Sequence, residues 1–576
     1  MNKIEQLRQL YTELKARRSQ NLSLWQDVSR YVGITVDSNY QDEITVEGKE
    51  RDNYIDDPTA ALSVIQAGDY LDGILWGNGD KVFNIEPADE LLRLSDKHTL
   101  RDYFDFRTAQ LHKHMNHENA GFNRARKPYL YDQFSFGTSA VGLFINDKYR
   151  AGIEDNPFVF RNFGVDCMAI DEGVNGAVDT VFITYRWRTN RIYQTFGEQT
   201  PEHIKESWRT KDYNKQYTLV QAIYPRENYE PTKKGKLGTK YVGEWFEDNR
   251  GDIFYSEDFK EFPCPVCRMM KIRGEVYGIS PGTMLISTIK LVNYVMQQGV
   301  ENVERKNDPA LGTFGDAMFG DSVVDTSAGS LMVFNPEYNQ GNPLFKAYEE
   351  GDPTGMISFL IPYLNEKIAT GFKIDVLLDF ASSAAQTATE STYRYSIRGK
   401  SLAGIITQQK SEMLMPLIKR AIQVEDSLNL KGIDPRVNEE EVKAVKGTDQ
   451  EGEVIPQAVL QFMEEGKQWY KITFNGELDR LSKSEEVDKI MSFVNGVGMV
   501  AQLLPNVLQG VNDYEILEAI NEATGNNLIK SKREYEEIME AIAEQNAQMQ
   551  QLQGADQASD IIKKLGGKKG IEELST

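Results

Sequence analysis

Three cysteines are the first candidates for chemistry, because two of them form one Cys-x-x-Cys motif, Cys264-Pro265-Val266-Cys267. A structural zinc ion needs about four ligands, and the chain has no second motif of this kind. A thioredoxin-like redox motif opens a helix after a strand, whereas this motif follows Pro263 and contains a second proline. We therefore interpret Cys264 and Cys267 as structural, and so few cysteines suit a reducing compartment.

Three closely spaced histidines, His112, His114 and His117, suggest a second possible metal site. On a helix only His114 and His117 share a face, and no H-E-x-x-H pattern follows them. We therefore expect these histidines to be structural. The sequence predicts no bound metal and no cofactor.

Two glycine-containing segments resemble parts of catalytic motifs. Gly399-Lys400-Ser401 matches the end of a P-loop, but Arg394 stands where the first glycine is required. It also lies inside a predicted helix, whereas phosphate binding needs the free N–H groups of a turn at a helix N-terminus. Residues 137–142 (GTSAVG) have one residue too many for a G-x-S-x-G nucleophile elbow and predict a turn into a strand. The sequence predicts no catalytic residues, and we expect a protein that is not an enzyme.

The composition restricts the function classes further. The 576 residues include 65 Lys or Arg and 87 Asp or Glu, which gives a formal net charge of −22. A free-standing DNA-binding protein is usually basic, so this balance argues against that class but not against a conduit that lets DNA pass without holding it. No run approaches the roughly 20 apolar residues of a membrane span, and the amphipathic N-terminus lacks the apolar core of a signal peptide. We expect folding in a cytoplasm and no membrane contact.

A chain of this length predicts two to four packed regions, and its patterns predict an α+β fold. Residues 1–35 predict a helix, because apolar residues recur at helical spacing, and residues 97–135 are mostly helical. Short alternating runs between residues 137 and 270 predict strands separated by turns. Further elements are predicted at 59–76 (helix), 82–86 (strand), 389–424 (long helix), 471–474 (strand) and 484–552 (helices).

Two amphipathic helices are predicted on either side of residues 309–350, a segment rich in Gly, Asn and Pro. The first begins after residues 278–282 (GISPG) and ends before Asp308. The second lies within 353–378, where Pro362 marks either a kink or the first turn of the helix. Each apolar stripe is either ordinary core or a surface that neighbouring copies cover. The stripes are Leu285, Ile289, Val292, Met296, Val300 and Val303 on the first helix, and Ile357, Leu360, Leu364, Ile368 and Phe372 on the second.

Three segments carry a resemblance to one protein family. They are residues 277–309 (YGISPGTMLISTIKLVNYVMQQGVENVERKNDP), residues 386–422, which contain TATE and a Glu412 followed by Pro416-Leu417-Ile418, and residues 472–494 (ITFNGELDRLSKSEEVDKIMSFV). In their order and spacing they resemble the portal, or head-to-tail connector, proteins of short-tailed, podovirus-like bacteriophages. With a looser match around DDPTAALSVIQAGDYLDGIL, the resemblance covers most of 50–530.

The resemblance implies a portal fold in a ring oligomer, with an α/β wing, a two-helix stem, a small α/β clip, a tunnel loop and a helical C-terminal crown. The implied boundaries are 1–278 for the N-terminal part of the wing, 279–306 and 353–375 for the stem helices, 307–352 for the clip, 376–389 for the tunnel loop, 390–480 for the C-terminal part of the wing, and 481–576 for the crown and a mobile tail.

The same resemblance implies a homo-oligomer, usually a dodecamer, at one capsid vertex, through which double-stranded DNA is packaged, retained and ejected. The implied partners are the major capsid protein, scaffolding or internal core proteins, the terminase large subunit, tail adaptor or nozzle proteins, and DNA contacted without sequence specificity. The protein would assemble in the host cytoplasm and end in the virion. The alternatives are a tail adaptor, which is usually much shorter, and an assembly-associated hydrolase, which the missing motifs disfavour.

The implied tunnel loop supplies the candidate channel residues. Asp379 would face DNA without attracting it, and Phe380 would act as a bulky gate. The alternative is that residues 381–390 begin the following helix, since alanine is the best helix former. The loop candidates are Asp379, Phe380, Ser382, Ser383 and Gln386, and the candidate DNA-facing basic residues are Lys367 and Lys373 of the second stem helix, for which a solvated helix face is the alternative.

Overall fold

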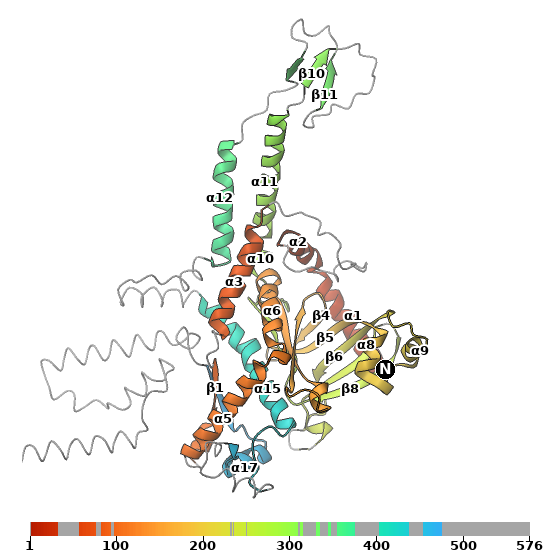
Figure 1. The fold of residues 1–576 in the computed structure, drawn as a ribbon, viewed down its shortest axis with the longest axis vertical. Coiled ribbons are helices and arrows are strands. Elements are labelled where there is room, and N and C mark those ends of the chain that lie inside the picture. The colour runs from red at the N-terminus through yellow and green to blue at the C-terminus, as the bar shows by residue number, and fades with distance from the viewer. Residues whose placement is uncertain are drawn as a thin grey trace, which may run out of the picture. The chain divides into compact units, whose positions relative to one another are not determined.

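The computed structural model describes residues 2–32, 57–76, 82–93, 97–230, 233, 235–248, 250–308, 311–314, 330–334, 344–346, 354–374, 402–436 and 453–474. The chain divides into two units, Met1–Phe474 and Asn475–Thr576, and all described residues belong to the first. This unit mixes helices and β-sheets (Figure 1), which confirms the predicted α+β class. The helices predicted within 484–552 lie outside the described residues.

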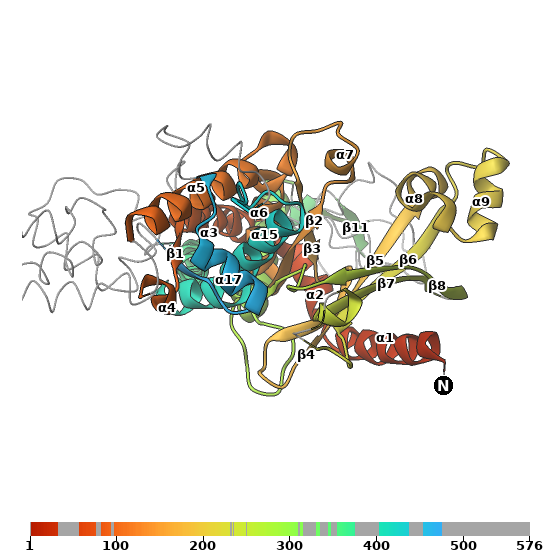
Figure 2. The ribbon, with the colours of Figure 1, turned by 90° about the horizontal axis from the view of Figure 1, so that it is seen from below.

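A five-stranded antiparallel sheet has the order β4-β5-β6-β7-β8, which confirms the prediction of strands in this part of the chain. Helix α1 (Lys3–Ser19) covers one face of it, as Figure 2 shows. Its apolar side chains Ile4, Leu7, Tyr11 and Leu14 are buried against the sheet because they recur at helical spacing. The strands are Met168–Glu172, Val178–Arg188, Gln216–Pro225, Tyr241–Glu247 and Arg250–Phe259.

The single helix predicted over residues 1–35 is wrong, because a second helix, α2 (Leu22–Val32), follows α1 after a two-residue break. Its buried residues Trp25, Val28 and Val32 belong to a different core. Helix α2 packs against α3 (Thr59–Trp76) and α6 (Phe122–Phe136) and against α10 (Pro281–Met284) and α11 (Ile286–Asn307), which follow the sheets in sequence. The chain must therefore turn between the two helices.

Helix α6 (Phe122–Phe136) leads into a second, three-stranded sheet of order β3-β2-β9 through Gly137. The φ angle of Gly137 is +85°, and a Cβ there would lie 2.5 Å from the carbonyl carbon of Ile279. Only glycine meets both requirements at this position. The predicted turn into a strand is confirmed, and the strands are β2 (Thr138–Ile145), β3 (Phe158–Gly164) and β9 (Val266–Arg268).

Two strands that are distant in sequence form a two-stranded sheet. Strand β1 (Phe83–Pro87) is antiparallel to β13 (Tyr470–Phe474), with Phe83 opposite Phe474. Both strands are predicted from sequence, but their pairing is not. The remaining elements of the body are α3 (Thr59–Trp76), α4 (Asp89–Leu92), α5 (Lys97–Met115), η1 (Glu118–Ala120), α7 (Asp147–Arg150), α8 (Thr189–Phe196), η2 (Gly197–Gln199), α9 (Glu202–Arg209), η3 (Lys236–Gly238) and α17 (Gln457–Glu465).

The long helix predicted from about residue 389 is described from residue 402. Residues 402–409 are α-helical, Lys410–Leu414 form a π-helix, and α15 (Met415–Ser427) continues the same helix. Pro416 has no N–H to donate to the carbonyl oxygen four residues earlier. Just before it, the i→i+4 hydrogen bonds of the α-helix therefore give way to the i→i+5 pattern of a π-helix. No helix among the described residues is both long enough and apolar enough to cross a membrane.

The two amphipathic helices are confirmed as α11 and α12 (Thr354–Gly371), which lie side by side (Figure 1). Pro362 lies inside α12, so the helix does not begin there. Between the two helices in sequence, β10 (Leu311–Phe314) pairs in parallel with β11 (Leu331–Phe334) and antiparallel with β12 (Leu344–Lys346).

Candidate functional site

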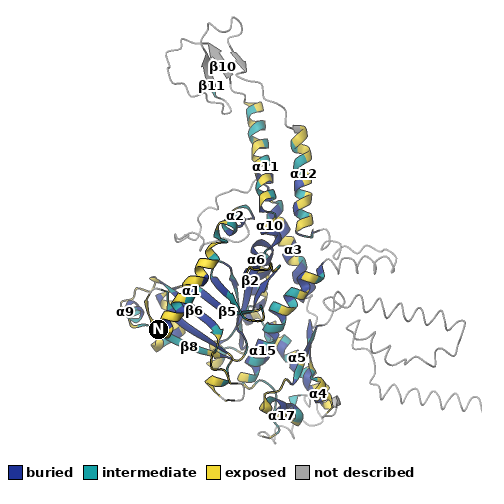
Figure 3. Cartoon of the chain, turned by 180° about the vertical axis from the view of Figure 1, so that it is seen from behind, coloured by how far each residue is buried: buried dark blue, intermediate teal, exposed yellow. Residues whose placement is uncertain are grey.

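Helix α12 carries two apolar stripes. One of them contains Leu364 and Ile368, which are buried. The other, which we name the outer stripe, consists of Met356, Phe359 and Tyr363, whose exposed fractions are 68%, 68% and 43%. A helix that is apolar on two faces is normally enclosed on both. Among the residues that the structure describes, none covers the outer stripe, and Figure 3 shows α12 exposed along this part of its length.

The outer stripe is an ordered row of side chains that ends at a lysine. The rings of Phe359 and Tyr363 are stacked, with centroids 6.0 Å apart and an interplanar angle of 9°. The Nζ atom of Lys367 lies 4.6 Å from the centre of the Tyr363 ring, within the range of a cation–π interaction. Lys367 is exposed, and its charge lies beside an aromatic surface.

The apolar side chains of helix α11 are buried near its N-terminal end and exposed toward its C-terminal end. Ile289 and Val292, near its start, are buried. Val300 and Val303, later on the same predicted stripe, are 52% and 57% exposed. The interpretation as core is therefore confirmed for the first half of this stripe only, and a surface that neighbouring copies cover stays a prediction for the second half.

Hydrogen bonds of Asp57 connect both helices to the segment that precedes α3. The backbone N–H of Asp57 donates to Oδ1 of Asn293 in α11 over 3.0 Å, and Nδ2 of Asn365 in α12 donates to Oδ2 of Asp57 over 3.2 Å. Asp57 and Asn293 are both buried. The short segment before α3 thus links α11 to α12 through hydrogen bonds to both helices.

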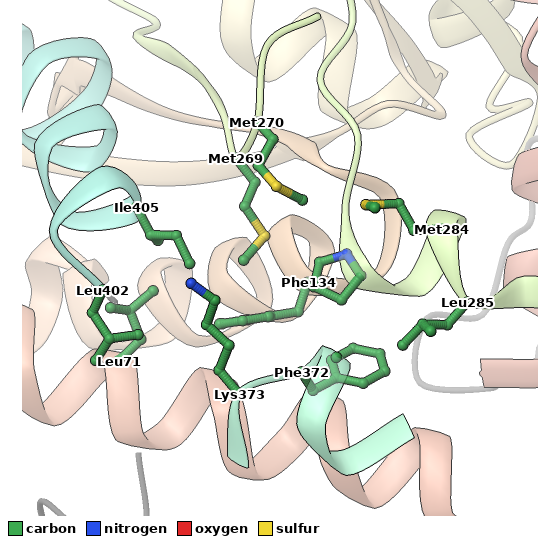
Figure 4. Close-up of a pocket in the computed structure, with 12 residues that line it drawn as sticks. Leu71, Phe134, Met269, Met270, Met284, Leu285, Phe372, Lys373, Leu402 and Ile405 are labelled. Carbon is green, nitrogen blue, oxygen red and sulfur yellow. The ribbon is translucent and has the colours of Figure 1, made fainter. Parts of the chain in front are cut away.

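A cavity of about 270 Å³ lies at this end of α12 (Figure 4). Its walls come from α3, α6, the chain after β9, the α10–α11 junction, the end of α12 and residues 402–405. The lining is apolar apart from one lysine, and three of its side chains are methionines. The lining residues are Leu71, Phe134, Met269, Met270, Pro281, Met284, Leu285, Gly371, Phe372, Lys373, Leu402 and Ile405.

The two candidate basic residues do not lie on one helix face. Helix α12 ends at Gly371, and Lys373 follows it with a φ angle of +57° in the left-handed region. Lys373 lines the cavity, whereas Lys367 lies at the end of the outer stripe. The assignment of Lys373 to the second stem helix is therefore corrected, because the helix stops two residues earlier.

The candidate channel residues lie outside the described part of the chain. The structure describes the chain up to Ile374 and again from Leu402. This gap contains Asp379, Phe380, Ser382, Ser383 and Gln386, together with Lys400 of the P-loop-like segment, so their predicted roles stay predictions.

The Cys-x-x-Cys motif is part of the core. Cys264 and Cys267 are free thiols and both are buried. Burial raises the pKa of both thiols, which disfavours the reactive thiolate. Within the described residues, no group of three or more His, Cys, Asp or Glu side chains is arranged to hold a metal ion.

The three histidines make separate structural contacts. A ring nitrogen of His112 lies 3.0 Å from the carbonyl oxygen of Phe83, and Nδ1 of His114 lies 2.7 Å from Oε1 of Glu425. His117 accepts a hydrogen bond from the N–H of Asn119. His117 lies outside the helix, because α5 ends at Met115, so His114 and His117 do not share a helix face.

A buried arginine that sequence reasoning missed ties three distant segments together. Arg268 is 1% exposed, and its backbone N–H and Nε donate to Glu412 of the π-helix over 2.8 and 3.1 Å. Its guanidinium also pairs with Glu172 and donates to the carbonyl of Gly176 over 2.8 Å. We name these residues the Arg268 cluster. Glu412 belongs to the segment that carries the family resemblance, but its partner has no sequence signal.

Asp132 is a buried carboxyl group of α6. Burial raises its pKa to about 7, and the nearby charge of Asp166 adds to the rise, while a hydrogen bond from Asn162 opposes it. An unfolded aspartate has a pKa near 3.9. The folded chain therefore holds this proton more tightly than the unfolded chain, so stability falls as the pH rises from about 4 through about 7.

Asp132→Asn, which keeps the shape but cannot ionise, is expected to reduce this fall. In urea titrations at a series of pH values between about 5 and 8, the variant should lose less unfolding free energy than the parent chain. A residual slope is expected from Glu257, whose pKa burial also raises to about 7. Parallel pH profiles of the two chains would contradict the assignment.

Comparison with known proteins matches this chain to a protein family and to solved structures. A family model described as bacteriophage head to tail connecting protein matches residues 4–527, which is most of the chain. Among solved structures, a chain from the virion of a native gene transfer agent (GTA) particle is 10% identical, with 68% of this chain and 90% of that chain covered and a TM-score of 0.26. No curated protein matches the chain.

Proposed function

Because this chain belongs to the family of bacteriophage head to tail connecting proteins, we propose that its copies assemble into a ring around a channel for double-stranded DNA. As a member of that family it is a structural component of a virion, in which it links head and tail, and it is not an enzyme. The ring, the channel and the passage of DNA during packaging, retention and ejection are the proposed part of this function.

The outer stripe of α12 is the observation that carries the ring proposal. Met356, Phe359 and Tyr363 form a row of large apolar side chains that the described part of their own chain leaves exposed. The exposed half of α11, with Val300 and Val303, is a second apolar surface that the described residues do not cover. Two different surfaces that pair head to tail generate a ring when the rotation closes. We propose that the outer stripe of one copy packs against α11 of the next.

The division into parts and partners completes the proposal. We propose a dodecamer of a short-tailed phage, with residues 1–278 and 390–480 as the wing, 279–306 and 353–375 as the stem, 307–352 as the clip, 376–389 as the tunnel loop and 481–576 as the crown. The partners would be the major capsid protein, scaffolding or core proteins, the terminase large subunit and tail adaptor or nozzle proteins. A net charge of −22 per chain favours a conduit along which DNA slides with little binding.

The positions of the two candidate lysines support contacts other than DNA. Lys367 lies over the ring of Tyr363 at the end of the outer stripe, which favours a place in the subunit contact. Lys373 lines the apolar cavity at the end of α12.

Sedimentation of the purified protein, followed by electron microscopy along the particle axis, tests the ring. We expect an assembly of several hundred kilodaltons with rotational symmetry and a central hole. A stable monomer at micromolar concentration would overturn the proposal. The length of this chain also argues against the alternative of a tail adaptor, because adaptors are usually much shorter.

Shortening residues 380–385 tests the proposed tunnel loop. If residues 376–389 line the channel, the deletion is expected to leave the ring intact and to impair DNA retention or packaging in an assembly assay. A matched deletion of residues 233–238, of which 233 and 235–237 are exposed, should affect neither property. Loss of the ring would make residues 380–385 part of the core, and normal packaging with an intact ring would remove their role in the channel.

A further inference from the structure

The cavity at the end of α12 has the volume of a small-molecule site. Its volume of about 270 Å³ exceeds that of an engineered cavity of roughly 150 Å³ that stays dry and binds benzene. By proportion it holds a molecule of about ten non-hydrogen atoms. Leu71, Phe134 and Leu402 form parts of its wall and are almost completely buried, so the wall is built into the core.

The lining favours an uncharged occupant. Apart from Lys373, the described lining residues are apolar. Lys373 already interacts with another group of the chain, so its ammonium gives no reason to expect a charge on a ligand. A buried water needs about two to four polar partners, and a lining of this kind supplies few. An apolar molecule is therefore the occupant that fits.

Two kinds of side chain in the lining favour an aromatic ring. The thioethers of Met269, Met270 and Met284 are of the type that makes favourable contacts with the edges of aromatic rings. The rings of Phe134 and Phe372 offer the offset or edge-to-face contacts that aromatic pairs prefer. Figure 4 shows the side chains of Met269 and Phe372 on different sides of the cavity, so an aromatic ligand would have a sulfur atom on one side and a phenyl ring on another.

We propose that this cavity binds a small uncharged aromatic molecule of one or two rings. Met284 is 63% exposed, whereas Met269 and Phe372 are buried, which places the entrance beside Met284 and the deeper part of the site at the end of α12. The inference does not depend on the ring of subunits, because every described wall comes from one chain.

Occupancy of the cavity would connect three parts of the chain. The described walls include the end of α12 with Phe372, the α10–α11 junction with Met284, and the helix that contains Leu402. A molecule that fills the cavity would contact all three at once. Ligand binding should therefore stabilise the junction of α11 and α12 with the body, and the thermal midpoint should rise with ligand concentration.

Titration of the full-length protein with toluene tests the proposal, with methylcyclohexane as the saturated probe of similar shape. Spectra of protein labelled at the methionine methyl carbons give both the affinity and the location. Toluene is expected to shift the signals of Met269, Met270 and Met284, assigned by Met→Leu replacements, and to leave buried Met115 of α5 unchanged. No saturable binding, or shifts spread over all methionines, would overturn the proposal.

Variants that fill the cavity locate the site independently. Ile405→Phe adds a ring at a lining position and should abolish binding of both probes, and Met284→Trp, at the proposed entrance, should do the same if the first variant fails to fold. Ile153→Phe makes the same replacement at a position that is 73% exposed and does not line the cavity, and it should bind as the parent does. Toluene binding of parental strength in both lining variants would place the site elsewhere and overturn the proposal.

The preference for an aromatic ligand is tested by removing one sulfur atom. Met269→Leu nearly conserves the volume of the side chain and removes its thioether. The ratio of toluene affinity to methylcyclohexane affinity should fall roughly twofold to tenfold, which corresponds to the strength of sulfur–aromatic contacts. Met115→Leu, which lies outside the lining, should leave the ratio unchanged. An unchanged ratio in Met269→Leu as well would overturn the assignment of an aromatic ligand.

Discussion

Replacement of Arg268 by alanine is expected to lower the free energy of unfolding by about 3–5 kcal/mol, the cost of leaving a buried ionic partner without its counter-charge. The guanidinium is almost fully buried, and it satisfies Glu412, Glu172 and the carbonyl of Gly176 at once. Alanine would remove all of these bonds and leave Glu412 without its cationic partner, whereas Glu172 would keep its ion pair with Lys271. Urea denaturation followed by tryptophan fluorescence measures the change.

The control for this prediction is an arginine–carboxylate ion pair at the surface. Arg17 lies 2.9 Å from Asp171, and both side chains are more than a third exposed. Arg17→Ala should therefore cost less than about 1 kcal/mol. Both variants are compared at one protein concentration, because assembly couples stability to concentration. Equal effects of the two replacements would show that the Arg268 cluster does not hold the fold together.

The parts of this fold that can be predicted from sequence are those with local signals. Helix α3 matches its predicted bounds because an apolar, alanine-rich segment begins after Pro58 and stops at Gly77. The strand pair β1 and β13 shows the limit: both strands have the right pattern, yet nothing local says that Phe83 lies opposite Phe474. Pairing of distant strands depends on the packing of everything between them.

The same distinction applies to the candidate site. The spacing of Met356, Phe359 and Tyr363, three and then four residues, is visible in the sequence and would have identified the outer stripe as a second apolar face. The bonds between Arg268 and Glu412 have no such signal, because a strand and a distant π-helix supply the two residues. The cavity is equally hidden, since its walls come from segments spread over most of the described chain.

Phe359→Asp is expected to abolish the ring while leaving the subunit folded. Phe359 is 68% exposed in the single chain, so the replacement removes little of the subunit's own core. In the proposed contact, the ring of Phe359 would be buried against the next copy. Burial of a large apolar side chain stabilises a contact by about 1.5–3 kcal/mol, and burying an unpaired carboxylate there adds a further cost. Because every contact in a ring carries the same change, the penalties accumulate.

Sedimentation should show that Phe359→Asp shifts the protein from a large assembly to a species of one-subunit mass, with an unchanged circular dichroism spectrum. Ser358→Asp is the matched control, because Ser358 is also exposed and lies about 100° around the helix from Phe359. This control adds the same charge to α12 outside the outer stripe and should leave the ring intact. Loss of the ring in both variants would point to net charge as the cause. An intact ring in Phe359→Asp would place the subunit contact elsewhere and leave the outer stripe to cover another partner.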